Sequence, residues 1–245
     1  MKTQLIVWIS LLGAMVAPGS DVPLHVATTP VPREEPEWRE RVEALNALSK
    51  EKGVRVAFVG DSITEMWALD DVGKSTWEKY WAPLGAANFG IAGDRTEHVL
   101  WRLDHGNLDG LSPRVIVLMI GTNNAGQQFE DGGYRCTAEQ TADGIRAIIG
   151  RLKKKCPGAK ILLMAIFPRG EEESDPARRQ NDATNDLIRG LADSKTVFFM
   201  DIGKRFLKPN GDGEVTIMPD MVHLSDKGYR IWAEAMRPVV HDLLR

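Results

Sequence analysis

Five short apolar runs, each followed by a turn and a stretch with helical spacing, constrain the fold of this chain most strongly. Two of them, "VIVLMI" (115–120) and "ILLMAIF" (161–167), are apolar at consecutive positions, which indicates strands buried on both faces. Strands that alternate with helices and are buried in this way are typical of a parallel sheet covered on both sides. The sequence therefore predicts an α/β fold, a three-layer α/β/α sandwich around a five-stranded parallel sheet. The expected strands are Val54–Val59, Ala87–Ile91, Arg114–Ile120, Lys160–Phe167 and Thr196–Asp201.

The residues that directly follow the predicted strands are the candidates for function, because ligands bind such sheets beyond the carboxyl ends of the strands. Ser62 follows the first strand in "GDSIT", Gly93 follows the second in "GIAGDRT", and Asn123 follows the third in "GTNN". A later segment, "PDMVHLSDKG", contains Asp220 and His223. The pattern predicts that a hydroxyl, a glycine, an amide and an Asp–His pair meet at one edge of the sheet.

This set of side chains suits nucleophilic catalysis on an ester. A serine attacks when a base takes its proton, and histidine is the usual base near neutral pH. A carboxylate then fixes the imidazole tautomer, and the i, i+3 spacing of Asp220 and His223 allows that contact. The tetrahedral intermediate needs hydrogen-bond donors at its oxyanion. The backbone N–H groups of Ser62 and Gly93 and the side-chain amide of Asn123 are the expected donors.

Each residue also has an ordinary structural explanation when it is taken singly. Asp61 and Ser62 fit a strand-to-helix turn as helix caps, and we expect Asp61 to support the serine in that way. Gly93 suits a turn with positive φ, and Asn123 suits an Asx turn. Their occurrence together at successive sheet-edge positions favours the enzymatic interpretation.

Five segments, in this order, resemble the blocks of the SGNH (GDSL-type) esterase and lipase superfamily. They are "FVGDSIT", "NFGIAGDRTEHVLWRL", "VLMIGTNN", "IFPRG" and "DMVHLSDKGY", and the resemblance extends over roughly residues 54 to 235. The likeness is strongest to the catalytic subunits of intracellular platelet-activating-factor acetylhydrolase and their bacterial relatives. The chain has Ile63 where the older motif name has Leu, a common variation.

The resemblance implies a flavodoxin-like sheet with strand order 2-1-3-4-5. It also implies that Ser62 is the nucleophile, that His223 is the base oriented by Asp220, and that Gly93 and Asn123 complete the oxyanion hole. We therefore expect a serine esterase that hydrolyses short-acyl carboxylic esters, with acetyl as the expected acyl group. The alcohol half would be a small molecule, an O-acetylated glycan or a lipid.

Three alternatives stay open at this stage: a lysophospholipase, a thioesterase, or a non-catalytic binding module on the same fold. A binding module would be expected to lack one of the site residues, and this chain keeps them all. A long-chain lipase would need a wide apolar groove, whereas the loops expected at 126–135 and 169–182 are polar. These loops favour a small acyl group.

No cofactor and no metal are expected, since no cluster of His, Cys or carboxylates has ligand spacing. His98 lies four residues after Asp94 and imitates an Asp–His pair, but it falls within the helix expected after Gly93. The net charge of −3 and the pI near 6.0 give no indication of a nucleic-acid partner. Whether the chain forms a homodimer is open.

The first 20 residues have the pattern of a secretory signal peptide. Lys2 precedes an apolar run of 12 residues, Leu5–Val16, which is too short to span a bilayer, and small residues follow it. We therefore expect an exported protein, periplasmic or secreted, with no stable membrane span after processing. Residues 21–36 hold four of the 13 prolines and read as a linker, so the hydrolase domain is expected at 37–245.

The two cysteines, Cys136 and Cys156, are not expected to pair with each other. Residues 137–155 read as one helix that opens with a capping box of Thr137 and Gln140. A helix of this length spans about 28 Å, whereas a disulfide requires Cα atoms within about 7 Å. The basic residues 151–155 are expected in its last turn, where cations suit the helix dipole.

Overall fold

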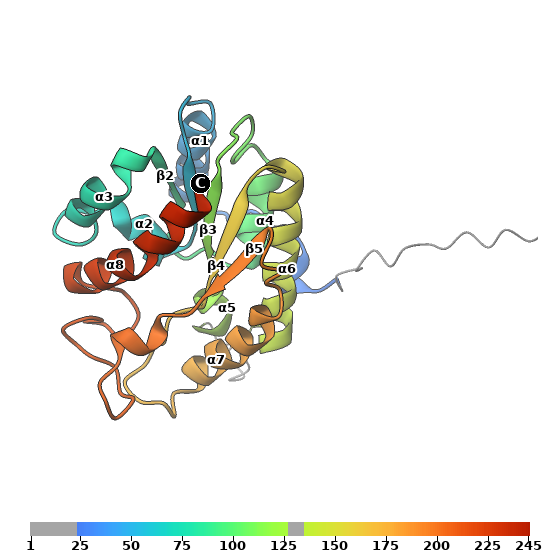
Figure 1. The fold of residues 1–245 in the computed structure, drawn as a ribbon. Helices are drawn as coiled ribbons and strands as arrows, with labels where there is room; N and C mark the ends of the chain where they lie inside the picture. Colours follow the sequence, from blue (N-terminus) through green and yellow to red (C-terminus); the bar gives the residue numbers. More distant parts are fainter. Residues whose placement is uncertain (1–23, 127–134) are drawn as a thin grey trace, which may run out of the picture.

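The computed structural model describes residues 24–126 and 135–245, and a five-stranded parallel sheet forms its centre (Figure 1). The strand order is β2-β1-β3-β4-β5, so both the expected fold class and the expected order are confirmed. The strands are β1 (Val56–Gly60), β2 (Ala86–Gly90), β3 (Val115–Met119), β4 (Lys160–Met164) and β5 (Val197–Met200).

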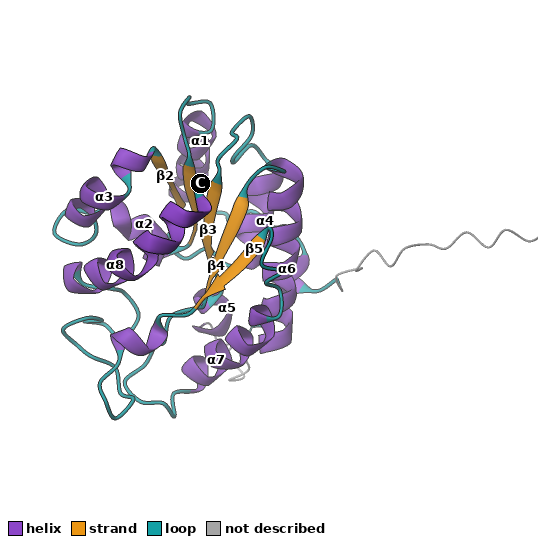
Figure 2. Cartoon of the chain, in the orientation of Figure 1, coloured by secondary structure: helices purple, strands orange, loops and turns teal. Residues whose placement is uncertain are grey.

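Helices cover both faces of the sheet (Figure 2). The alternating side chains of each strand supply the two cores. In β1, Ala57 and Val59 face the layer formed by α1, α4, α6 and α7, whereas Val56 and Phe58 face α2, α3 and α8. The helices of the first layer are α1 (Pro36–Leu48), α4 (Thr96–Asp104), α6 (Ala138–Lys155) and α7 (Pro176–Arg189). Those of the second layer are α2 (Ser62–Glu65), α3 (Lys74–Tyr80) and α8 (Asp226–Leu243).

The shorter elements lie mostly in the connections between strands. The helix α5 (Thr122–Gly126) follows β3 directly, and the 3₁₀ helices are η1 (Val26–Thr28), η2 (Met66–Ala68), η3 (Ala82–Leu84) and η4 (Gly203–Phe206). Within the described residues, no helix combines the length and apolarity needed to cross a bilayer.

The fourth strand is shorter than its apolar run suggests. The run Lys160–Phe167 was expected to be strand throughout, but β4 ends at Met164. The backbone N–H and carbonyl of Ile166 bond instead to the side-chain amide of Asn185 on α7, at 2.7 and 2.8 Å. An apolar run shows that a segment is buried, but it does not show which groups form hydrogen bonds with its backbone N–H and carbonyl groups.

The segment 169–182, expected to be a polar loop, becomes helical at Pro176, so this part of the prediction was wrong. Asp175 caps α7 by accepting a hydrogen bond from the backbone N–H of Arg178 at 3.0 Å, and Pro176 occupies the first helical position. The Asp-Pro pair is a helix-start signal that outweighs the polarity of the segment. The other expected loop, 126–135, falls almost wholly outside the described residues.

The described part of the expected linker contacts the domain. Ala27 and Thr28 of η1 are buried, and the hydroxyl of Thr96 donates to the carbonyl of Ala27 at 2.9 Å. Arg33 donates to the carbonyl of Ala92 at 2.6 Å. The expected domain boundary at residue 37 therefore has domain contacts on both sides of it. The predicted signal peptide, residues 1–20, lies outside the described residues and stays a prediction.

The capping box expected at the start of α6 is present. Thr137 Oγ1 accepts from the N–H of Gln140 at 3.2 Å, and the Gln140 side chain accepts from the N–H of Thr137 at 2.9 Å. Cys136 and Cys156 stand at opposite ends of this helix and do not pair with each other, as expected, and both are buried free thiols. Basic residues 153–155 form its last turn.

Candidate active site

Ser62 is the first residue of α2 and lies just beyond the carboxyl end of β1, with only Asp61 between them. Gly60 closes the strand, and a Cβ at this position would overlap the side chain of Thr64 and the carbonyl of Met119. Only glycine permits this close approach. Asp61 is buried and caps α2, because its Oδ1 accepts from the backbone N–H of Ile63 at 3.0 Å. The turn holds Ser62, half-buried, at the sheet edge.

Ser62, His223 and Asp220 form an unbroken series of hydrogen bonds. Ser62 Oγ lies 2.9 Å from His223 Nε2, and His223 Nδ1 lies 2.6 Å from Asp220 Oδ2. The serine and histidine are 161 positions apart in the chain, and the fold brings them together where β1 ends and before α8 begins. The sequence therefore selected three residues that the structure places in direct contact.

The second carboxylate oxygen of Asp220 organises the turn that carries the histidine. Asp220 Oδ1 accepts from the backbone N–H groups of Val222 at 3.0 Å and His223 at 2.7 Å. Partial burial raises the pKa of Asp220, but these bonds and the one from the His223 ring outweigh it, so the pKa falls below its usual value. Asp220 is thus held ionised beside the imidazole.

Besides Ser62, the expected oxyanion donors are Gly93, in the loop after β2, and Asn123, in the first turn of α5. Gly93 has a φ of 77°, in the left-handed region that favours glycine. Asn123 Nδ2 donates to the carbonyl of Asp94 at 2.9 Å, which joins the loop after β2 to the start of α5. This bond uses one N–H of the Asn123 amide and leaves the other for a ligand.

Arg33 contacts the Gly93 loop from the N-terminal segment. Its Nη1 donates to the carbonyl of Ala92, and a Cβ at Gly93 would lie 2.8 Å from that nitrogen. Glu35 pairs with the same guanidinium at 2.8 Å. Sequence reasoning missed Arg33, because it placed residues 21–36 in a linker. A run of prolines gives no signal for a side chain that reaches a site so distant in sequence.

A buried ion pair lies beneath the candidate site. Arg102 and Asp94 are fully buried, and Arg102 Nε donates to Asp94 Oδ2 at 2.8 Å. Arg102 Nη2 also donates to the carbonyl of Gly60 at 3.0 Å, and Trp38 Nε1 donates to Asp94 Oδ1 at 2.7 Å. The pair connects the end of the serine strand to the Gly93 loop. Sequence reasoning missed it, although an arginine among the apolar residues of "VLWRL" is a usable signal.

Burial of this cluster raises the pKa values of its two carboxyl groups, Asp61 and Asp94. Burial raises the pKa of Asp61 to about 7, the hydrogen bond from the Ile63 N–H opposes this, and the nearby Asp94 carboxylate adds to it. Burial also raises the pKa of Asp94, and the Arg102 guanidinium opposes that rise. Arg102 therefore acts on both buried carboxylates, and Asp94 has a second cation, Arg33, at 3.8 Å.

His98 does not join Ser62 in this structure. It lies in α4 and is nearly buried, and its Nδ1 accepts from the backbone N–H of Arg95 at 3.1 Å. Burial lowers the pKa of His98 to about 3, and the guanidinium of Arg95 acts in the same direction. A pKa this low makes the ring a weak proton acceptor, and it is His223 that bonds to Ser62.

The described residues hold no group of three or more His, Cys, Asp and Glu side chains placed to bind a metal ion.

The model of the GDSL-like Lipase/Acylhydrolase family matches residues 58–231, which include all the candidate site residues. The chain belongs to this family. The resemblance predicted from the sequence is confirmed, and the chain is a carboxylic ester hydrolase.

Curated relatives and solved structures agree with this assignment. Platelet-activating factor acetylhydrolase IB subunit alpha1 of Bos taurus is 34% identical over 208 residues, and the match covers 84% of each chain. Subunit alpha2 of Rattus norvegicus is 36% identical over 208 residues, with 84% of this chain and 85% of that one covered. The crystal structure of the acetyl xylan esterase AlAXEase has a TM-score of 0.62 at 25% identity and covers 76% of this chain and 100% of that chain.

Proposed function

We propose that this chain is a serine esterase that removes short acyl groups, above all acetyl, from carboxylic esters. The observation that carries the proposal is the hydrogen-bonded series from Ser62 through His223 to Asp220 at the carboxyl edge of the sheet. A nucleophile, a base in contact with it and a carboxylate in contact with the base are the parts that acyl transfer to serine requires.

In this mechanism, His223 Nε2 takes the proton of Ser62 as Oγ attacks the carbonyl carbon of the ester. The tetrahedral intermediate that results carries its negative charge on the former carbonyl oxygen. The backbone N–H groups of Ser62 and Gly93 and the Asn123 amide would donate to that oxygen. His223 then gives the proton to the departing alcohol, and an acyl group stays on Ser62. Water activated by His223 releases the acid in the second half of the cycle.

Asp220 would hold the imidazole in the tautomer that leaves Nε2 free to accept a proton. Its contact with His223 Nδ1 at 2.6 Å fits that role. Its lowered pKa keeps it ionised, so that it stabilises the imidazolium formed during attack. Asp61 would support the serine through the helix cap and would not touch the substrate.

The choice of acyl group draws on the relatives. Two of them are named as platelet-activating factor acetylhydrolase subunits and one as an acetyl xylan esterase, so acetyl is the acyl group that their names share. The alcohol half would be an O-acetylated glycan or a lipid. The predicted export of the chain favours the glycan.

The test is hydrolysis of nitrophenyl acetate and nitrophenyl octanoate by the parent and by Ser62→Ala, with Ser174→Ala as a control at an exposed serine. We expect the acetate to exceed the octanoate at least tenfold in kcat/KM. We expect Ser62→Ala to lose on the order of 10³-fold or more, since nucleophile and base act as a unit. A folded Ser62→Ala protein with more than a tenth of the parental rate would refute the assignment. Preference for octanoate would indicate a lipase or lysophospholipase.

A further inference from the structure

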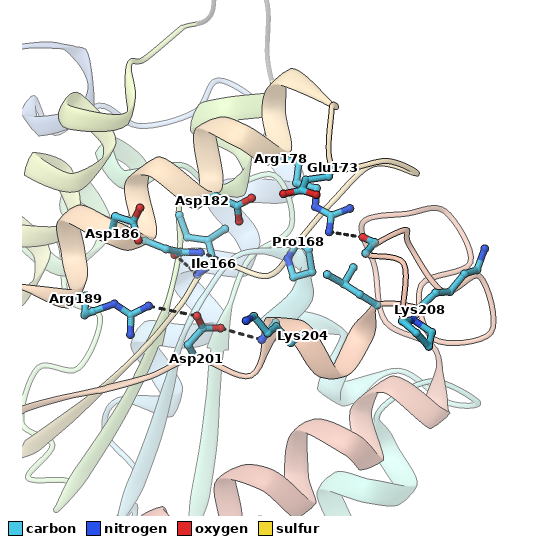
Figure 3. A pocket seen from close by; sticks show the side chains of 15 residues that line it. Ile166, Pro168, Glu173, Arg178, Asp182, Asp186, Arg189, Asp201, Lys204 and Lys208 are labelled. Atoms are coloured by element: carbon cyan, nitrogen blue, oxygen red, sulfur yellow. Dashed lines mark hydrogen bonds and ion pairs between the residues drawn. The ribbon is translucent and has the colours of Figure 1, made fainter.

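A cavity of about 700 Å³ opens between α7 and the segment that follows β5 (Figure 3). Its apolar lining comes from Ile166, Pro168, Leu207 and Pro209. None of the residues proposed for catalysis lines it. The cavity lies at the carboxyl edge of the sheet, and its volume is in the range of roughly 300–1,000 Å³ that is usual for small-molecule sites.

The cavity is next to the candidate active site. Its lining residue Glu173 belongs to the loop that follows β4, and Gly170 of that loop donates its backbone N–H to the carbonyl of Met221 at 2.9 Å. Met221 directly follows Asp220. The loop that lines the cavity is therefore bonded to the turn that carries Asp220 and His223.

The polar lining of the cavity is dense and balanced in charge. Its carboxylates belong to Glu173, Asp182, Asp186 and Asp201. Its cations belong to Arg178, Arg189, Lys204 and Lys208. Figure 3 shows most of these groups extending from α7 on one side and from the 201–208 segment on the other, with Glu173 on the loop before α7. Only part of this set is paired internally, as in the contact between Arg189 and Asp201 at 3.5 Å.

Arg178 supplies the strongest indication of a ligand. The residue is only 3% exposed, and its Nη2 donates to the carbonyl of Gly211 at 2.7 Å. Its Nη1 is buried and has no hydrogen-bond partner among the described residues. A buried donor without a partner costs about 1–3 kcal/mol, more when it is charged, so such groups normally have an acceptor. Because Arg178 lines the cavity, a ligand there would supply that acceptor once the guanidinium turns its covered Nη1 toward it.

The lining chemistry favours one ligand class. An anion would be attracted by the cations and repelled by an equal number of carboxylates, and an apolar ligand would remove charged groups from water without compensation. Hydroxyl groups both donate and accept, so they satisfy carboxylates and guanidinium groups alike. The C–H faces of a sugar ring would cover the apolar lining.

We propose that this cavity binds a neutral, polyhydroxylated segment of a glycan, and that the glycan is the alcohol half of the ester. Binding of a glycan in the cavity does not depend on the proposed esterase function. The second part of the proposal, that this glycan is the alcohol half of the ester, deepens that function and rests on it. Arg178 Nη1 would donate to a sugar hydroxyl, and carboxylates on α7 would accept from others. The acetylated position of the same glycan would then reach Ser62 across the loop after β4.

The first experiment measures binding without turnover. Unsubstituted xylohexaose, cellohexaose and chitohexaose are titrated into the Ser62→Ala protein by calorimetry, alone and combined with Arg178→Gln. The control is Arg179→Gln, an exposed neighbour on α7 that does not line the cavity. We expect at least one hexaose to bind, at least tenfold weaker binding with Arg178→Gln, and no change with Arg179→Gln. Lys204→Gln, an exposed lining position, should weaken binding threefold or more even where Arg178→Gln fails to fold.

Three results would overturn the cavity proposal: no binding of any hexaose at millimolar concentration, unchanged binding in both lining variants, or tighter binding of inorganic phosphate or glucuronate than of the neutral sugars.

The second experiment compares KM for acetylated xylo-oligosaccharide between Lys204→Gln and Arg179→Gln. Equal KM values would overturn the link to the substrate. Nitrophenyl acetate carries no glycan, so its hydrolysis by the parent tests the esterase function separately. If the parent does not hydrolyse this ester, the proposed function is overturned, and the hexaose titration still tests the cavity.

Discussion

Replacing Asp61 by Asn should stabilise the protein in a pH-dependent way. Asp61 is 1% exposed, and its Oδ1 accepts from the N–H of Ile63. Asparagine keeps an oxygen at that position and caps a helix about as well as aspartate. The substitution therefore removes the ionisable group and preserves the cap. It also removes a second carboxylate from the neighbourhood of Asp94, whose partner is Arg102.

The size and sign of the effect follow from the pKa of Asp61. Burial raises it from an ordinary value of 3.8 to about 7. Below about pH 4 the carboxyl group holds its proton in both the folded and the unfolded chain, so its ionisation does not lower the free energy of unfolding. Between about 4 and 7 only the folded state holds it, so the stability of the parent falls as the pH rises. Above 7 the loss is complete and amounts to about 4 kcal/mol, at about 1.4 kcal/mol per pH unit.

The assay is urea unfolding followed by tryptophan fluorescence at intervals from pH 4 to 8. We expect equal free energies of unfolding for parent and Asp61→Asn near pH 4 and an advantage for the variant that grows to about 4 kcal/mol near pH 8. The control Glu43→Gln makes the same change from carboxylate to amide at an exposed position on α1. A difference between Asp61→Asn and the parent that stays constant across this range would show that Asp61 is ionised throughout, and would refute the reasoning.

Two further substitutions test the proposed roles at the site. Asn123→Ala should lower kcat about 10²–10³-fold with less effect on KM, because an oxyanion donor acts mainly in the transition state. An unchanged kcat with a raised KM would assign Asn123 to substrate binding. Asp220→Asn should lower kcat on the order of 10²–10⁴-fold, since the amide oxygen can still accept from the backbone of the turn but the amide nitrogen cannot accept from His223 Nδ1. Steady-state kinetics on nitrophenyl acetate measure both, and a kcat for Asp220→Asn near that of the parent would remove Asp220 from the proposed series.

The sequence predicted the sheet because burial on both faces leaves a simple trace. Runs such as Val115–Met119 are apolar at every position, and each is followed by polar residues where the chain leaves the sheet. The same rule located the candidate site, since parallel strands end at a common edge. Ser62 and Asn123 could therefore be selected from their places after the first and third strands, and His223 from its spacing to Asp220.

The elements that were missed depend on contacts between distant segments. The end of β4 is set by the Asn185 amide, which competes with the neighbouring strand for the backbone of Ile166. The position of Arg33 follows from the docking of η1 on α4 and α6, which no local pattern indicates. Arg102 was visible as a charge in an apolar helix, but its partner Asp94 was not.

These missed contacts explain how the proposed oxyanion donors could be held in place. The Gly93 loop is bonded to three parts of the chain: to Arg102 through Asp94, to the Asn123 amide through the carbonyl of Asp94, and to Arg33 through the carbonyl of Ala92. Removing one partner of a buried ion pair typically costs about 3–5 kcal/mol, so the loop cannot move away without a large loss of stability. Electrostatic stabilisation of an oxyanion is effective when its donors are oriented before the substrate arrives. A loop fixed from three directions meets that requirement, and for this reason we expect the buried pair beneath the site to matter for catalysis as well as for folding.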